Sequence, residues 1–166
     1  MNILKKAAQK AKDFMKNTKK ELKTTKQNFV KNFKRKYTHK KTVQRLAAGN
    51  LLTFTYNALD NTKKFDRKPL IISLGRSKGN SKRLLGLNLH WMPENQRVLL
   101  ASLIVEMLDK KGGVLEYNDV KPLIRKFDGK PILRMYAIHR ISQKVIEMPK
   151  DVYLRAASID YADWSE

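Results

Sequence analysis

The sequence predicts an α+β fold, in which a small antiparallel sheet of three or more strands packs on one main helix, with a long basic helix or tail at the N-terminus. Three short segments between residues 51 and 89 alternate apolar and polar residues, which is the period of a half-buried strand. The run that follows, residues 94–110, repeats its apolar residues at helical spacing instead. Because an apolar sheet face and an apolar helix face must each bury against another layer, these segments predict one shared core.

The three predicted strands share the same alternation. Its apolar positions are Leu52, Phe54 and Tyr56, then Leu70, Ile72 and Leu74, then Leu85, Leu87 and Leu89. The connection between the first two strands is polar and ends at Pro69, which suits the first residue of a strand. Between the second and third strands, residues 75–83 contain two glycines and four cations, so we expect a flexible hairpin loop there.

The main predicted helix spans residues 94–110. Pro93 fits its start, because the first helical turn has no intrahelical acceptor for the missing N–H of proline. Two lysines and two glycines at residues 110–113 signal its end. Beyond it, we expect a second helix from Asn118 through Phe127 and a short helix over residues 150–157. Between these two helices, the segment that begins at residue 132 fits a helix in its first part and a strand, ending at Pro149, in its second part.

The first 46 residues carry 16 of the 36 Lys and Arg residues and two acids, so +14 of the net charge of +21 lies there. This shift in composition predicts two units: a basic N-terminal amphipathic helix or arm over residues 1–48, and a small α+β domain over residues 49–166. A heptad pattern places the apolar seam of the helix at Leu4, Ala8, Ala11, Met15, Leu22 and Phe29. Because this seam is weak and the lysines repel one another, a solvated, disordered tail is the alternative.

The net charge of +21 predicts a polyanionic partner, which is nucleic acid, an anionic membrane surface or an acidic protein. The absence of cysteine excludes disulfides, thiolate metal sites and cysteine nucleophiles. No apolar run approaches the roughly 18–20 residues that span a bilayer, and the N-terminus lacks the apolar stretch of a signal peptide. We therefore expect a soluble protein made in the cytoplasm.

Two basic clusters are the candidates for contact with phosphates, one near the end of the N-terminal segment and one in the predicted hairpin loop. The candidate nucleic-acid-binding residues are Lys34, Arg35, Lys36, Lys40 and Lys41 in the first cluster, and Arg76, Lys78, Lys82 and Arg83 in the second. Such clusters neutralise phosphates and release counterions without reading bases. The hairpin loop does not match a nucleotide-binding P-loop, because no Gly-Lys-Ser/Thr follows a glycine at the required spacing.

The sequence shows no catalytic or metal-binding pattern, so we expect a protein that is not an enzyme and uses no cofactor or metal. The three histidines lie far apart and form no helical metal-ligand pair; they are His39, His90 and His139. A metal-dependent nuclease is the rival from another class. It would require Asp60, Asp66 and Glu94 to meet around a metal, and nothing in their spacing brings them together.

The central stretch reads F-D-R-K-P-L-I-I-S-L, then L-L-G-L-N-L-H-W-M-P, then an apolar helix. Its characteristic positions are Phe65, Asp66, Pro69, Gly86, Leu87, Asn88, Leu89, His90, Trp91, Met92 and Pro93. This pattern resembles a family of small virion proteins of large tailed bacteriophages often labelled DNA end protector, and the resemblance covers roughly residues 51–157. It implies a turn-and-cap motif of Asp66, Asn88, His90 and Trp91, in which Asn88 and His90 bond backbone groups where strand passes to helix.

Charge pattern and resemblance together predict a non-enzymatic structural protein of the virion, in the neck, tail or baseplate. We expect its basic N-terminal arm to bind DNA non-specifically, and protection of DNA ends is the role that the resemblance implies. The expected partners are other virion proteins in a symmetric assembly and the DNA phosphate backbone. Two alternatives stay open: a structural adaptor whose basic helix binds an acidic partner protein, and a membrane-surface helix that acts in genome delivery.

Overall fold

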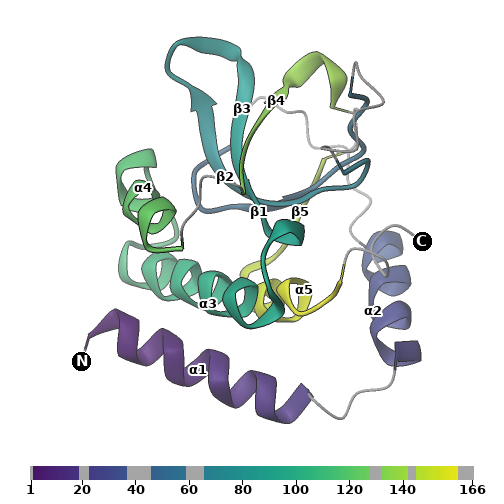
Figure 1. Cartoon of the computed structure of the whole chain (residues 1–166), viewed down its shortest axis with the longest axis vertical. Coiled ribbons are helices and arrows are strands. Elements are labelled where there is room, and N and C mark those ends of the chain that lie inside the picture. The colour runs from purple at the N-terminus through teal and green to yellow at the C-terminus, as the bar shows by residue number, and fades with distance from the viewer. Residues whose placement is uncertain are drawn as a thin grey trace.

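The computed structural model of the chain describes residues 2–18, 23–36, 46–58, 66–127, 132–141 and 145–160, with the backbone alone for residues 23, 24 and 33–36. Figure 1 shows a sheet at one end of the molecule, a layer of helices beneath it, and a further helix beneath that layer. The predicted α+β class, with an antiparallel sheet on a main helix and a helix at the N-terminus, is confirmed.

The sheet has five described strands in the order β4-β3-β2-β1-β5, and all neighbours are antiparallel. The strands are β1 (Leu51–Thr53), β2 (Leu70–Ser77), β3 (Asn80–Asn88), β4 (Leu133–Ala137) and β5 (Ile146–Glu147). The loop expected at residues 75–83 is mostly strand, because Ser77 pairs with Asn80 and leaves only two residues in the turn. The helix expected from residue 132 is wrong, because this segment pairs with β3 as the edge strand β4.

The described α-helices are α1 (Ile3–Thr18), α2 (Lys23–Lys36), α3 (Glu94–Lys110), α4 (Tyr117–Lys126) and α5 (Tyr153–Ala157), and the short 3-10 helices are η2 (Leu89–Trp91), η3 (Ile138–Arg140) and η4 (Lys150–Val152). The main helix α3 has the bounds that the sequence predicts. α4 begins before Asn118, because the Asp119 carboxylate accepts a hydrogen bond from Glu116 N at 2.9 Å and caps the helix there. None of the described helices is both long and apolar enough to cross a lipid bilayer.

Both faces of the sheet are covered. Leu51, Leu70 and Ile72 belong to the core shared with the helices, whereas Leu52 and Ile71 belong to a second core on the opposite face. In that second core the Tyr136 ring lies edge-on to the rings of Phe54 and Tyr56, with centroids 5.3 and 5.1 Å apart. Aromatic pairs prefer this arrangement, so the three rings form one packed cluster within the second core.

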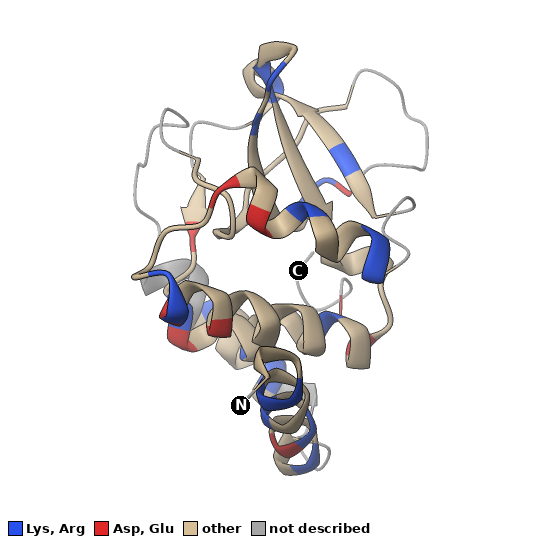
Figure 2. Cartoon of the chain, turned by 90° about the vertical axis from the view of Figure 1, so that its left-hand side faces the viewer, with Lys and Arg blue, Asp and Glu red and all other residues tan. Residues whose placement is uncertain are grey.

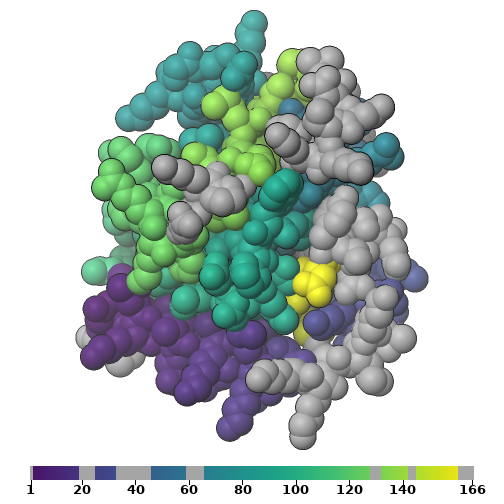
Figure 3. Space-filling view, in the orientation of Figure 1, coloured from purple at the N-terminus to yellow at the C-terminus, as the bar shows by residue number. Residues whose placement is uncertain are grey.

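α3 lies between the sheet and α1, and Figure 3 shows the side chains of α1 directly bordering the neighbouring helices. Ala7 and Ala11 are buried in the contact, and Ser102 Oγ donates a hydrogen bond to the Ala7 carbonyl oxygen at 3.0 Å. Lys6 Nζ lies 2.7 Å from a carboxylate oxygen of Glu106 on α3. The N-terminal helix expected as an arm is therefore packed, over residues 3–18, against the core of the domain expected to begin at residue 49.

The heptad seam expected from the sequence is confirmed at Ala11 and Met15, which pack in or against the core, but the buried face differs by about one residue at the start of α1. Leu4 is 40% exposed and Ala8 is exposed, whereas Ile3, Ala7 and Phe14 pack toward the core. The seam expected at the start of the helix is therefore wrong, because the contacts with α3 turn Ile3 and Ala7, and not Leu4 and Ala8, toward the core. Farther along, α2 contributes a buried Val30 and a Phe29 ring that lies 5.4 Å from the guanidinium of Arg155.

Candidate nucleic-acid interface

The hairpin of β2 and β3 carries the second predicted cationic cluster. Ser77 and Asn80 pair across its two-residue turn, and the Asn80 side chain accepts a hydrogen bond from Lys82 N at 3.0 Å. Arg76 Nη1 donates to the Ser81 carbonyl oxygen at 3.3 Å, which links the two strands near the tip. Figure 2 shows Lys and Arg residues at this tip, at the opposite end of the molecule from α1.

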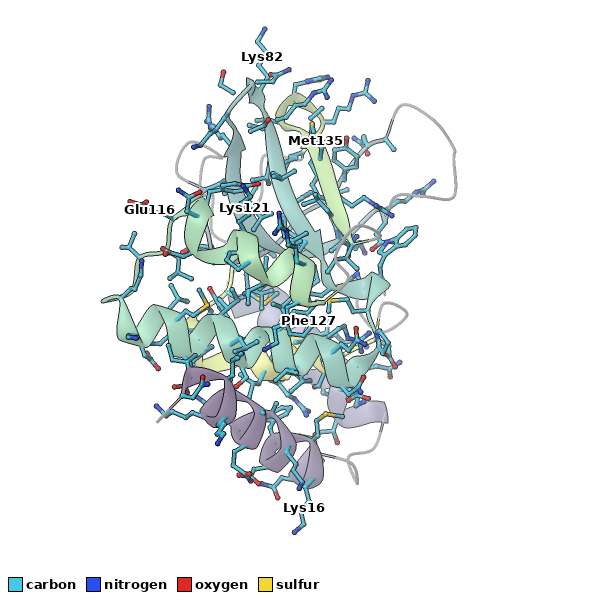
Figure 4. All side chains as sticks on the ribbon, turned by 60° about the vertical axis from the view of Figure 1, so that its left-hand side comes forward. Lys16, Lys82, Glu116, Lys121, Phe127 and Met135 are labelled. Carbon is cyan, nitrogen blue, oxygen red and sulfur yellow. The ribbon has the colours of Figure 1, made fainter. Side chains whose placement is uncertain are left out.

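A pocket of about 450 Å³ opens beside the hairpin, and we call it the basic pocket. Its described lining residues are Tyr56, Asn80, Lys82, Arg83, Met135, Ala137, His139 and Arg140. Half of these are Lys, Arg or His and none is acidic, so the pocket attracts anions. Lys82 and Met135 mark its position at the outer end of the sheet in Figure 4.

β4 and η3 supply the side of the basic pocket that faces the hairpin. Arg83 lies opposite Ala137 in the β3–β4 register, and its Nη1 atom lies 3.1 Å from Met135 Sδ. Arg140 Nε lies 3.3 Å from His139 Nε2. These contacts orient two guanidinium groups, and the fork of N–H donors on each group matches the oxygens of a phosphate.

The predicted cations do not all lie in the basic pocket. Lys82 and Arg83 line it, and Arg76 and Lys78 are exposed on the same hairpin. Lys34, Arg35 and Lys36 lie in the last turn of α2, where the backbone alone is described, and Lys40 and Lys41 lie outside the described residues. His139, Arg140 and Tyr56 were not among the residues that the sequence predicted to contact nucleic acid. The basic pair His139 and Arg140, two positions after the end of β4, was the available signal, but only the pairing of β4 with β3 places it beside the hairpin.

A polar network occupies the junction where β3 passes into η2. The Asp66 carboxylate accepts a hydrogen bond from Asn88 Nδ2 at 2.9 Å and lies 3.2 Å from His90 Nδ1. The Asn88 side-chain oxygen accepts a hydrogen bond from His90 N at 3.1 Å and so caps η2. Asn88 thus bonds the backbone as the turn-and-cap motif implies, whereas the ring of His90 bonds a carboxylate instead. The structure brings Asp66, Asn88, His90 and Trp91 together at this one junction.

The network shifts the pKa values of both titratable members downward. Burial raises the pKa of Asp66, but hydrogen bonds from His90, Asn88 and the Trp91 indole outweigh burial and hold the pKa below its usual value of 3.8. Burial lowers the pKa of His90 below 6.5, although the hydrogen bond and the charge of Asp66 oppose this shift. At neutral pH the site therefore holds a charged Asp66 and a neutral His90 whose Nδ1–H donates to the carboxylate.

In the part of the chain that the structure describes, no three His, Asp or Glu residues are placed to hold a metal ion. Of the three acids that a nuclease would need, Asp66 is engaged with Asn88 and His90, and Glu94 lies in the first turn of α3. Asp60 lies outside the described residues. What the described geometry offers is a cluster of cations around a pocket, which suits binding of an anion.

Comparison with known families gives one match over nearly the whole chain. The family described as phage T4 terminal DNA protecting protein matches residues 1–164. This match confirms the resemblance found in the central stretch and extends it over the N-terminal helices. No curated protein and no solved structure matches the chain.

Proposed function

The chain belongs to the family of phage T4 terminal DNA protecting proteins, and from this premise we propose that it protects the ends of phage DNA by binding them, without catalysing a reaction. The family description names protection of terminal DNA and no reaction. A protein that occupies a DNA end blocks an exonuclease by excluding it, so binding alone is sufficient for this role.

The basic pocket carries the proposal. Lys82, Arg83 and Arg140 line a concave surface whose described residues include no acid, and a duplex presents two phosphates for about every 3.4 Å of its axis. Neutralising these phosphates releases counterions and gives affinity that is independent of sequence. Arg76 and Lys78 extend the cationic surface along the hairpin beyond the pocket.

The N-terminal cluster is the second contact in this proposal. Lys34, Arg35 and Lys36 end α2, and Lys40 and Lys41 follow four and five positions later in the sequence. Because α1 packs on α3, deletion of the N-terminal segment would expose the core and confuse loss of folding with loss of binding. This cluster is therefore tested by substituting its cations with glutamine in the full chain.

The test compares DNA affinity over a salt series for two matched double variants. Lys82→Gln with Arg83→Gln removes two cations of the basic pocket. We expect the negative slope of log K against log salt concentration to become shallower by about 2. Lys5→Gln with Lys16→Gln removes the same charge from α1, at the opposite end of the molecule, and should leave the slope nearly unchanged. Equal effects of the two pairs would show that net charge, and not the pocket, determines binding.

Protection itself is measured as survival of linear duplex DNA in the presence of a purified exonuclease. We expect the wild-type chain and the α1 variant to protect the DNA and the pocket variant to lose protection at the same protein concentration. If the wild-type chain neither protects nor binds duplex DNA at moderate salt, the proposed function is wrong. Binding to an acidic protein in place of DNA would then support the structural adaptor.

We also propose that the protein acts in the virion, at the neck, tail or baseplate, with other virion proteins as partners. This placement follows from its phage family and from the need for a protector to remain at the DNA end. Mass spectrometry of purified particles, followed by separation of heads and tails, tests it. A membrane role is less well supported, because the apolar side of α1 that would enter a membrane packs on α3.

A further inference from the structure

Trp91 is a surface aromatic that the surrounding contacts hold in place. Trp91 is 39% exposed. Its indole is nevertheless held by a hydrogen bond with the Asp66 carboxylate, and this bond contributes to the lowered pKa of Asp66. The guanidinium of Arg134 lies over the ring, 4.4 Å from its centroid. An exposed aromatic ring fixed in this way is already ordered before any ligand arrives, so little conformational entropy is lost when a flat group stacks on it.

Trp91 forms part of a second pocket, of about 470 Å³, which we call the Trp91 pocket. Its described lining residues are Trp91, Met92, Gln96, Leu99, Lys126, Phe127 and Ile132. Its volume lies within the range of about 300–1,000 Å³ found for pockets that take small organic groups. Two aromatic rings, an amide and several apolar side chains make a lining that suits a nucleobase, which has apolar faces and polar edges.

The charge around the Trp91 pocket matches the phosphate that a nucleotide carries. Lys126 is part of the lining, Arg134 lies over the Trp91 ring, and no described lining residue is acidic. An apolar side chain of a partner protein would use the rings and make no use of these cations. A nucleotide uses both, because its base stacks on the ring and its phosphate meets the cations.

The edge strand β4 connects the Trp91 pocket with the basic pocket. Ile132 lines the first pocket, just before β4 begins, and Ala137 at the end of β4 lines the second. Five residues of extended chain span about 16 Å. In B-DNA, successive nucleotides of one strand rise by about 3.4 Å, so this distance corresponds to about five nucleotides. In Figure 4, Lys82 and Met135 lie toward the outer end of the sheet and Phe127 lies toward the helices.

We propose that the Trp91 pocket takes the terminal nucleobase of a DNA end, stacked on Trp91, while the basic pocket holds phosphates about five nucleotides inward. This inference rests on the proposed function and adds the feature by which an end is told from the interior of a duplex. Phosphates are the same at both places, so cations alone give no preference for an end. A terminal base leaves the stack at the smallest cost, and stacking on an aromatic ring accepts any base.

The first test uses the wild-type chain and duplexes that contain the fluorescent base 2-aminopurine. One duplex carries it at the terminal position and a second carries it in the middle of the sequence. Stacking on the indole quenches its fluorescence, so binding should quench the terminal label and leave the internal label nearly unchanged. Equal quenching of both labels, or no quenching of either while the protein is bound, would overturn the proposal.

The second test compares an open duplex with a dumbbell of the same sequence, whose ends are closed by loops. We expect the wild-type chain to prefer the open duplex by about tenfold, which corresponds to about 1.4 kcal/mol and lies within the range for stacking of one base. Trp91→Leu should reduce the ratio to near one without changing affinity for the dumbbell, and Trp91→Phe should restore much of the preference. Thermal unfolding of each variant shows whether the fold is retained.

The outcomes separate this inference from the proposed function. If Trp91→Leu keeps the preference for open ends, the Trp91 pocket does not recognise the terminal base, while end protection through the basic pocket stands. The inference also fails if the wild-type chain binds both DNAs equally with a steep salt dependence. If neither DNA binds, the proposed function itself fails and the inference fails with it.

Discussion

At the scale of single residues, Asp66 connects the polar side chains at the end of β3. Its carboxylate accepts from Asn88 and lies within hydrogen-bonding distance of His90 Nδ1, and the Trp91 indole helps to keep it ionised. The side chain of Asp66 is 13% exposed and that of His90 is 2% exposed, so water competes little for these bonds. The network therefore fixes the direction in which η2 leaves the sheet, and with it the position of Trp91.

The lowered pKa values predict that stability falls as the pH is lowered. The unfolded chain protonates His90 near pH 6.5 while the folded chain resists protonation, so the unfolded state binds more protons and the free energy of unfolding decreases below that pH. Asp66 adds a second decrease as the pH falls below about 3.8, because its folded-state pKa is also lowered. Urea unfolding measured at intervals from pH 7 to pH 3 checks both windows.

His90→Asn is the matched variant for the upper window, because the asparagine amide retains a donor for Asp66 and does not titrate. We expect the variant to lose the decrease between pH 6.5 and pH 5 and to keep the decrease at lower pH. If the wild-type chain is equally stable at pH 7 and pH 5, His90 is not held neutral in the fold.

At the scale of elements, α1 and α3 approach each other through small residues. Ala7 is fully buried in this contact, and its carbonyl oxygen accepts a hydrogen bond from the Ser102 hydroxyl. Glu106 is also largely buried and pairs with Lys6 and Lys10 from α1. The middle of α3 is consequently buried on nearly all sides, and its buried residues include the polar Ser102 and Glu106 beside the apolar ones.

Substituting neighbouring alanines of α1 tests this packing. Ala7→Leu places a larger side chain in the contact, and we expect it to lower the free energy of unfolding by about 1–3 kcal/mol. Ala8→Leu makes the same chemical change at an exposed position of the same helix and should change stability by no more than about 0.5 kcal/mol. Chemical denaturation of the two variants provides the comparison, and equal stabilities would mean that α1 is not packed on α3 in solution.

Elements with strong local patterns could be predicted from the sequence, and elements defined by distant partners could not. α3 was predicted to its bounds, because Pro93 precedes it, two glycines follow it and its apolar residues keep a helical period. The apolar residues of β4 fit a helix equally well, and only pairing with β3 decides for a strand. The seam of α1 was placed correctly at Ala11 and Met15 and displaced by about one residue at Leu4 and Ala8, because the sequence of a helix does not show which helix it will contact.

At the scale of the whole molecule, Arg97 joins the start of α3 to the C-terminal helix. It is 4% exposed, and its guanidinium donates to the carbonyl oxygens of Ala157 at 2.8 Å and Met92 at 3.4 Å. It also lies 2.6 Å from an Asp160 carboxylate oxygen, on a side chain that is 64% exposed. The buried bonds to backbone oxygens therefore contribute more to stability than the exposed ion pair does.

Two variants separate these contributions. Arg97→Met leaves buried carbonyl oxygens without their donors, and we expect a loss of about 1–3 kcal/mol in the free energy of unfolding. Asp160→Asn removes only the exposed charge and should cost no more than about 1 kcal/mol. Urea denaturation at one pH measures both, and a larger loss for Asp160→Asn would contradict this division.

The candidate interface could be predicted only in part, because it is assembled from distant segments. The hairpin cations were visible as a local cluster, whereas Tyr56, His139 and Arg140 reach the same pocket through the second core and the β3–β4 pairing. Residue composition indicated an anionic partner. In the proposed binding mode the DNA follows β4 from one pocket to the other, and the sequence pattern did not indicate the pairing of β4.

The packing of α1 on α3 also has a consequence for the order in which the chain acquires its structure. Ala7 and Ser102 are 95 positions apart, so a ribosome completes α1 long before it makes the helix that α1 covers. An isolated helix of this length is marginal in water, and closing so long a loop has an entropic cost. During synthesis, the cationic α1 segment is therefore exposed, without α3 to pack on, in a cell rich in nucleic acid. It can pack against α3 only after α3 has left the ribosome.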